Sequence, residues 1–145
     1  MKNKNKETNN SNKPYWYPKF KDIMKIYKNL QDVYEDMDGH VLRNEMGLKG
    51  ILDKVEYGLP FRETSFMEKV AYLWRDISTE HLFSEGNKRT GWLATRLILR
   101  KNGYSIRETE ETTPEMIYDF CIKITMEKVD IDRIIEWIRR NFIKI

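Results

Sequence analysis

The chain has 145 residues, 40% of them hydrophobic and 34% charged, which is typical of one soluble globular domain with its own core. Residues 1–13 hold four lysines and one glutamate and account for the whole net charge of +3, so the rest of the chain is neutral. This neutral body argues against a nucleic-acid partner, which needs cations gathered on the domain itself. One cysteine and two histidines exclude an internal disulfide and a Cys/His zinc cage.

No segment is typical of a membrane or secreted protein. No apolar run approaches the roughly 18 residues of a membrane span, and residues 1–13 lack the apolar core of a signal peptide. We therefore expect a cytoplasmic protein without a membrane partner. Residues 1–13 are predicted to form a disordered basic tail, and residues 14–145 a single domain.

A first helix is predicted from Pro18 onwards. Proline suits a first helical turn, and apolar residues recur at helical spacing from Phe20 to Val33. The helix ends at residues 36–39, which read Asp-Met-Asp-Gly. They resemble the start of a calcium-binding loop, but its twelfth position is Gly47 rather than glutamate, so we interpret them as a solvated turn.

The second and third helices have clear start signals. Asn44 caps the second helix, and Gly58 ends it. Ser65 and Glu68 form a capping box at the start of the third, in which the serine hydroxyl bonds the amide of the third helical residue and the glutamate reaches back. We expect this helix to run to about Glu80.

Three more helices complete the prediction. In the fourth, six of the eight residues 92–99 are apolar, which indicates a central position, and residues 102–103, Asn-Gly, are a helix stop. The fifth opens at Pro114 and the sixth at Asp130, with cations up to Lys144 at its end, where the helix dipole favours them.

Evidence for strands is confined to two short segments, residues 58–64 and 104–107, either of which could pair briefly. Helical patterns cover most of the remaining chain and are joined by short connections. The predicted fold class is therefore all-α, a compact six-helix bundle with at most a short β flap.

One stretch departs from the local rules for helices. Lys88 and Arg89 stand in a first helical turn, directly after a Gly-Asn breaker, although cations prefer the last turn. Such a departure is typical of a functional site, and free amides, the helix dipole and two cations would together bind a phosphate. Gly86 removes the Cβ that would keep a ligand off the backbone, and Asn87 caps the helix or braces the loop.

Two residues beside this phosphate nest could carry chemistry. Glu85 either balances the local charge or holds Mg²⁺, which binds through one or two carboxylates and the substrate's phosphates. His81 continues the apolar side of the third helix, as a partly buried histidine would, but near a phosphate it is a natural base for a hydroxyl. His40 lies in a polar turn without such neighbours and receives no role. These residues predict phosphoryl or nucleotidyl transfer and leave open which bond is cut.

The stretch from His81 to Thr90, HLFSEGNKRT, resembles the signature of the Fic/Doc family. The resemblance continues through residues 97–103, LILRKNG, which look like the end of the motif in Doc (death-on-curing) toxins. Residues 47–52 are similar to the family's early helix, so the likeness covers about residues 40–105. It implies a Fic/Doc-like bundle in which a central helix–loop–helix carries the active-site loop.

The resemblance also implies a role for each residue of the loop. His81 would be the general base that takes the proton from a Ser, Thr or Tyr hydroxyl of a target protein, and Phe83 would anchor the loop in the core. Glu85 stands where the family has its Mg²⁺ ligand, more often aspartate in Doc proteins. The residues that would bind the phosphates of ATP are Gly86, Asn87, Lys88 and Arg89, the last two also serving catalysis.

Two positions favour the Doc branch. Adenylylating Fic proteins usually carry glycine at the position of Lys88 and arginine at that of Trp92. In Doc-like members the lysine is thought to fill part of the nest, so that the nucleotide binds reversed and presents its γ-phosphate. The resemblance therefore implies a kinase toxin that uses ATP and Mg²⁺, and Doc-like toxins act on elongation factor Tu. Transfer of AMP by a Fic-type adenylyltransferase is the alternative.

Partners follow from the same resemblance. Many Fic proteins inhibit themselves through a terminal helix bearing Ser/Thr-x-x-x-Glu-Gly/Asn, but here Thr64 and Glu68 are followed by Lys69 within the chain, which implies an antitoxin supplied in trans. Residues 58–64 stand where the family has a flap for the target's backbone. A non-catalytic nucleotide-binding scaffold, or a DNA-binding helix pair, remains an alternative of another class, although the loop of about seven residues exceeds that of a helix-turn-helix.

Overall fold

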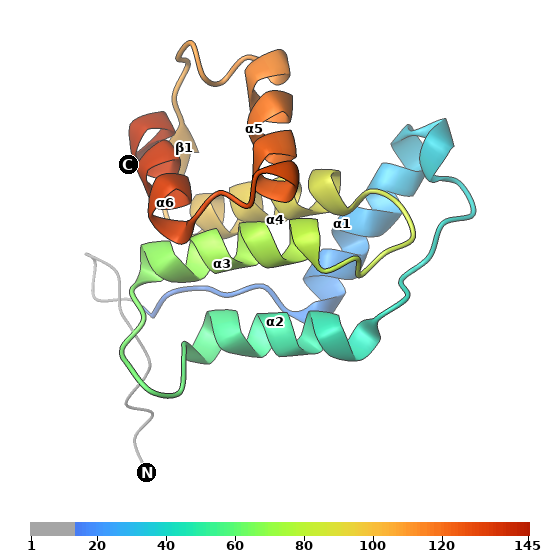
Figure 1. Ribbon diagram of the computed structural model, residues 1–145, viewed down its shortest axis with the longest axis horizontal. Coiled ribbons are helices and arrows are strands. Elements are labelled where there is room, and N and C mark those ends of the chain that lie inside the picture. Colours follow the sequence, from blue (N-terminus) through green and yellow to red (C-terminus); the bar gives the residue numbers. More distant parts are fainter. Residues whose placement is uncertain (1–13) are drawn as a thin grey trace.

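The computed structural model describes residues 14–145, and the basic tail predicted at residues 1–13 lies outside this range. The described chain is mostly helical, which confirms the predicted all-α class with six α-helices (Figure 1). Its elements are α1 (Phe20–Val33), the short 3₁₀ helix η1 (Glu35–Met37), α2 (Glu45–Tyr57), α3 (Phe66–Thr79), α4 (Asn87–Lys101), β1 (Tyr104–Ile106), α5 (Pro114–Met126), α6 (Ile131–Asn141) and β2 (Phe142–Lys144).

Capping side chains set the starts of four helices, as the sequence predicts. The Asn44 side chain accepts from the amide of Gly47 at 2.8 Å and begins α2. Ser65 and Glu68 form the predicted capping box of α3, which ends at Thr79. Thr113 and Asp130 accept in the same way at the starts of α5 and α6.

The start of α1 differs from the prediction. Pro18 lies before the helix rather than in its first turn, and Lys19 is the N-cap residue. The amide of Lys19 donates to the Asp22 carboxylate at 2.7 Å, so this acid, three residues into the segment, determines where the helix begins.

The two strands form a small antiparallel sheet in which Ser105 of β1 pairs with Ile143 of β2. The segment predicted at 104–107 is thus a strand, whereas residues 58–64 form none. The prediction that Lys144 ends the sixth helix is wrong, because α6 stops at Asn141 and Lys144 lies on β2, where its ammonium donates to the carbonyl of Asn102 at 2.7 Å.

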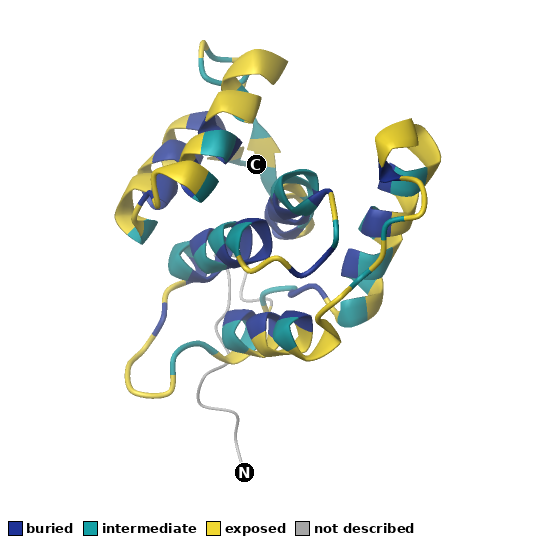
Figure 2. Ribbon diagram, turned by 45° about the vertical axis from the view of Figure 1, so that its right-hand side comes forward, coloured by how far each residue is buried: buried dark blue, intermediate teal, exposed yellow. Residues whose placement is uncertain are grey.

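The core is built around α3, which packs on α2, α4, α5 and α6 (Figures 1 and 2). Trp74 of α3 is fully buried, and its ring lies 5.2 Å from that of Trp92, 5.4 Å from that of Phe120 and 5.3 Å from that of Trp137. Each of these rings comes from a different helix. The aromatic cluster therefore fixes α4, α5 and α6 against α3.

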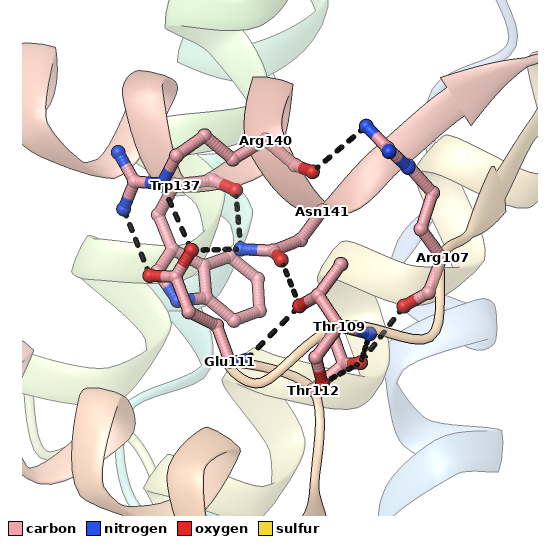
Figure 3. Close-up of polar contacts among 7 residues, drawn as sticks. All are labelled: Arg107, Thr109, Glu111, Thr112, Trp137, Arg140 and Asn141. Atoms are coloured by element: carbon pink, nitrogen blue, oxygen red, sulfur yellow. Dashed lines mark hydrogen bonds and ion pairs between the residues drawn. The ribbon is translucent and has the colours of Figure 1, made fainter.

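The connection between β1 and α5 is fastened to the end of α6 (Figure 3). The Arg140 guanidinium donates two hydrogen bonds to the Glu111 carboxylate, at 2.8 and 2.9 Å, and lowers its pKa. The Thr109 hydroxyl donates to the Asn141 side chain at 2.6 Å. These contacts hold the outer part of the bundle in place and leave the α3–α4 loop to other elements.

Candidate active site

The loop between α3 and α4, residues 80–86, carries the predicted chemistry and lies at one end of the bundle (yellow in Figure 1). His81 adopts a left-handed backbone with φ of 52° and its side chain is exposed. The expectation that it continues the apolar side of the third helix is therefore wrong, because the chain leaves the helix at Thr79 and turns. Left-handed backbone is uncommon for a residue with a Cβ, and here it presents the imidazole to solvent.

The middle of the loop is anchored in the core by Phe83. This side chain is 2% exposed, and its ring stacks on that of Tyr27 in α1 with centroids 4.0 Å apart. Leu82 beside it is fully buried. The exposed His81 thus stands directly next to two buried residues, which limits how far its backbone can move.

Asn87 braces the loop and does not cap the helix. Its side-chain oxygen accepts from the amide of Phe83 at 3.0 Å, and its side-chain nitrogen donates to the carbonyl of Phe83 at 2.9 Å. The N-cap position belongs to Gly86, whose carbonyl accepts from the hydroxyl of Thr90 at 2.7 Å. Of the two roles predicted for Asn87, the structure therefore shows the bracing of the loop and not the capping of the helix.

Gly86 is required by its backbone and by its neighbour. Its φ is +85°, and a Cβ there would lie 2.3 Å from Cε of Met37, which is fully buried. The predicted reason, room for a ligand, is wrong on this side of the glycine because Met37 fills the space. The amide of Gly86 donates to the Glu85 carboxylate at 3.1 Å, so an exposed side chain holds one amide at the N-terminus of α4.

The two cations predicted to act together lie on different sides of α4. Arg89 donates to both carboxylate oxygens of Asp36 at 3.2 Å, and its guanidinium lies 4.0 Å from the ring centroid of Tyr34. Lys88 is half-buried, and its charge acts on Cys121 of α5. Burial raises the pKa of the Cys121 thiol in α5 to about 11, while the charge of Lys88 acts in the opposite direction.

The connection between α1 and α2, residues 34–44, lies along this loop, and we call it the strap. The amide of Ser84 donates to the carbonyl of Val41 at 2.9 Å, and Leu42 and Phe83 form an antiparallel bridge. The amides of Arg43 and Asn44 both donate to the carbonyl of Leu82, at 2.7 and 3.1 Å. The strap therefore pairs with the active-site loop as a short edge strand would.

Sequence reasoning misses the strap. It interprets residues 36–39 as a solvated turn and assigns His40 no role, whereas Met37 is fully buried under Gly86 and His40 Nδ1 lies 2.9 Å from the Ser84 hydroxyl. Met37 is an apolar residue between two aspartates. Such a lone apolar residue in a polar turn is the signal that could have indicated a buried anchor.

A buried tyrosine connects α1 to the same loop. The Tyr27 hydroxyl donates to the carbonyl of Glu85 at 3.0 Å. Burial raises the pKa of Tyr27, a hydrogen bond with Ser84 lowers it, and the negative charge of Glu85 raises it further. A protonated Tyr27 is what the donation to Glu85 requires, so the phenol serves as a neutral support for the loop.

The model of the Fic/DOC family matches residues 17–99, which include α1, the strap, the loop and most of α4. The chain belongs to the Fic/DOC family. No curated protein matches it.

Fic/DOC proteins use ATP and generally transfer nucleotide-derived groups to proteins, so membership of the family suggests the class of protein-modifying transferases. Within residues 14–145 no group of three or more His, Cys, Asp or Glu side chains is arranged to hold a metal ion. A single exposed carboxylate, Glu85, fits Mg²⁺ only when the nucleotide supplies further oxygens, which is the usual way this ion binds. No helix of the described Fic/DOC chain is long and apolar enough to span a bilayer.

Proposed function

We propose that the protein is a Doc-like kinase that transfers the γ-phosphate of ATP to a hydroxyl group of a target protein. The observation that carries this proposal is which residue stands at the position where adenylylating members have a second arginine. Trp92 stands there, with its ring 5.2 Å from that of Trp74 and 5.8 Å from that of Trp137. This position is turned into the aromatic core and offers no cation to a phosphate.

In the proposed reaction, the phosphates bind at the N-terminus of α4, where the helix dipole favours negative charge and Asn87 supplies an amide. Gly86 supplies a second amide once the Glu85 carboxylate releases it. His81 takes the proton from the target hydroxyl, whose oxygen bonds to the γ-phosphorus. The bond to the bridging oxygen of the β-phosphate breaks, and ADP leaves. Mg²⁺ held by Glu85 would neutralise phosphate charge.

Arg89 reaches phosphate oxygens in this proposal only after it leaves Asp36. The ion pair is exposed on both sides, with 40% of the Arg89 side chain and 62% of the Asp36 side chain accessible. Exposed pairs of this kind contribute about 0.2–1 kcal/mol, so a triphosphate can displace the carboxylate. Lys88 on the other side of the helix would fill part of the nest and fix the direction of the nucleotide.

We further propose that the protein is a toxin restrained by an antitoxin in trans, with a translation factor such as elongation factor Tu as its target. In support, both residues with the spacing of an internal inhibitory motif serve the turn before α3. Thr64 accepts from the amide of Leu59 at 2.9 Å, and Glu68 caps α3 and pairs with Arg62 at 2.6 Å. Neither side chain is free to occupy the nucleotide site.

Two labels on ATP test the activity. A bacterial lysate is incubated with the purified protein and either γ-labelled or α-labelled ATP. We expect protein-bound label from γ-labelled ATP alone, and none with His81→Ala. Label from α-labelled ATP alone would assign the chain to the adenylyltransferases.

The variant Lys88→Gly tests the branch assignment in the same assay. We expect weaker γ-transfer and the appearance of some α-label on protein, because the nest regains the form found in adenylylating members. The control Lys123→Gly removes an exposed lysine of α5 outside the loop. Unchanged labelling by Lys88→Gly would contradict the assignment.

A further inference from the structure

The hydroxyl of Ser84 is the point where side chains join the strap to the active-site loop. The amide of Val41 donates to this oxygen at 2.9 Å, and His40 Nδ1 lies at the same distance. A serine oxygen has two lone pairs and one proton, and after accepting from Val41 it retains one acceptor and one donor. Tyr27 also hydrogen-bonds to Ser84 and competes for that donor, so the form of His40 that satisfies every group carries its proton on Nδ1 and donates it to Ser84.

His40 is itself fixed to α1. Its carbonyl accepts from the side chain of Gln31 at 2.6 Å, and its amide donates to the carbonyl of Met37 at 3.2 Å. The backbone of His40 is thus fixed by α1 and by Met37, independently of the active-site loop. The path from α1 to Ser84 is continuous: it consists of the hydrogen bond from Gln31 to the His40 carbonyl and the contact of the His40 imidazole with Ser84.

The two ends of the loop are held by different contacts. Residues 85–87 are fixed by Tyr27, by the Asn87 brace and by the bond between Thr90 and Gly86. The end that carries His81 is held to the strap by backbone pairing. The contacts of the Ser84 hydroxyl with His40 and Val41, which we call the Ser84 cluster, add side-chain hydrogen bonds to this pairing. Loss of the cluster should loosen the His81 end and leave the phosphate end in place.

Resting on the kinase function proposed above, we propose that His40 is a positioning residue that, through Ser84, holds the strap against the loop and orients His81 towards the target hydroxyl. The imidazole of His40 does not touch the reacting atoms. Its contribution is to the geometry of the base, and such contributions enter the rate of the chemical step more than the binding of nucleotide.

Two independent readouts test this role. Hydrogen–deuterium exchange of the peptide spanning residues 82–86 reports loop order whether or not the protein is a kinase. The apparent maximal rate and KM for ATP come from γ-label transfer at a fixed lysate concentration. We expect His40→Leu to accelerate exchange and to lower the maximal rate about 3- to 10-fold, the range that loss of one hydrogen bond allows, with KM for ATP within about 2-fold.

Matched variants distinguish positioning from a general loss of stability. Ser84→Ala removes the contact with His40 and also the bond from the Val41 amide, so it should lose at least as much as His40→Leu. The double variant should lose no more than Ser84→Ala alone, because the His40 contact is already absent from it. His40→Asn, whose amide can occupy the Nδ1 position, should restore the rate. Asp38→Ala, in the same turn and exposed, is the control and should leave both readouts unchanged.

Additive losses in the double variant, or a rise in KM with an unchanged maximal rate, would overturn the proposal. Unchanged exchange in both single variants would do so as well. If the unmodified protein transfers no label from ATP, the kinase function fails, and the exchange measurements alone then decide whether His40 orders the loop.

Discussion

Gly86 shows how one residue joins the fold to the site. Its φ of +85° is accessible to glycine without strain, and the space a side chain would take belongs to Met37 of the strap. The same residue is the N-cap of α4, at the end of the helix where the proposed reaction places the phosphates. Backbone conformation and strap packing therefore both depend on the absence of a single carbon atom at the edge of the proposed phosphate site.

Gly86→Ala should both destabilise the protein and abolish nucleotide binding. Left-handed backbone costs an alanine about 1 kcal/mol or more, and the contact with Met37 adds to this because Met37 is fully buried. Urea unfolding measures the first effect, and calorimetry with Mg²⁺ and ATP the second.

Gly50→Ala is the matched control. Gly50 lies within α2, where an added Cβ would meet no atom within 4 Å, so alanine there should raise the free energy of unfolding by about 0.5–1 kcal/mol and leave nucleotide binding unchanged. Equal behaviour of the two variants would contradict the role assigned to Gly86.

The starts of the helices follow from local chemistry, whereas the arrangement of the active site depends on contacts between residues far apart in the sequence. The caps at Asn44 and Ser65 involve residues three positions apart, so the sequence alone predicts them. The strap joins the loop through contacts such as His40–Ser84, 44 residues apart, and no spacing rule reports such a pair. The expectation that His81 continues the third helix fails because the chain leaves α3 at Thr79 and turns through a left-handed His81, which the helical spacing does not predict.

The capping box of α3 should make stability depend on acidity. Hydrogen bonds from Arg62 and from the amide of Ser65 lower the pKa of Glu68 to about 2, from an ordinary value of 4.5. The unfolded chain therefore takes up this proton first as the pH falls, so the contribution of Glu68 is complete above about 4.5 and is lost towards about 2.

Glu68→Gln should be less stable than the unmodified protein at neutral pH, and its stability should fall less between about pH 4.5 and 2. Urea unfolding at a series of pH values measures both slopes. Parallel curves for the two proteins would contradict the lowered pKa. The exposed Glu115→Gln, in the first turn of α5, is the control.

For the whole molecule, the aromatic cluster links the proposed choice of reaction to the stability of the bundle. Trp92 belongs to the active helix α4, yet its ring contacts partners on α3 and α6 and lies 6.2 Å from that of Phe142 in β2. At this position adenylylating members are expected to carry an arginine that binds phosphate, whereas here a tryptophan packs the helices together. The sequence alone shows that this position departs from the pattern of adenylylating members, and it does not show that the ring packs in the core.

Trp92→Arg should therefore destabilise the protein and not convert it into an adenylyltransferase. Replacing the ring with a guanidinium among other rings should lower the free energy of unfolding by about 3 kcal/mol, since it removes packing and brings a charge into the cluster. Urea unfolding and the α-label assay measure the two outcomes. Arg96→Lys, exposed on the same helix, is the control; a stable Trp92→Arg protein that transfers AMP would contradict this account.

The pairing of the strap with the loop has a consequence for how the chain can vary in length. Connections between helices ordinarily tolerate inserted residues, because little depends on their path. Between α1 and α2 the register of the chain decides that Met37 meets Gly86, that His40 meets Ser84 and that Leu42 meets Phe83. An insertion or deletion of one residue there would shift every later contact, so this surface segment is as intolerant of altered spacing as a core strand.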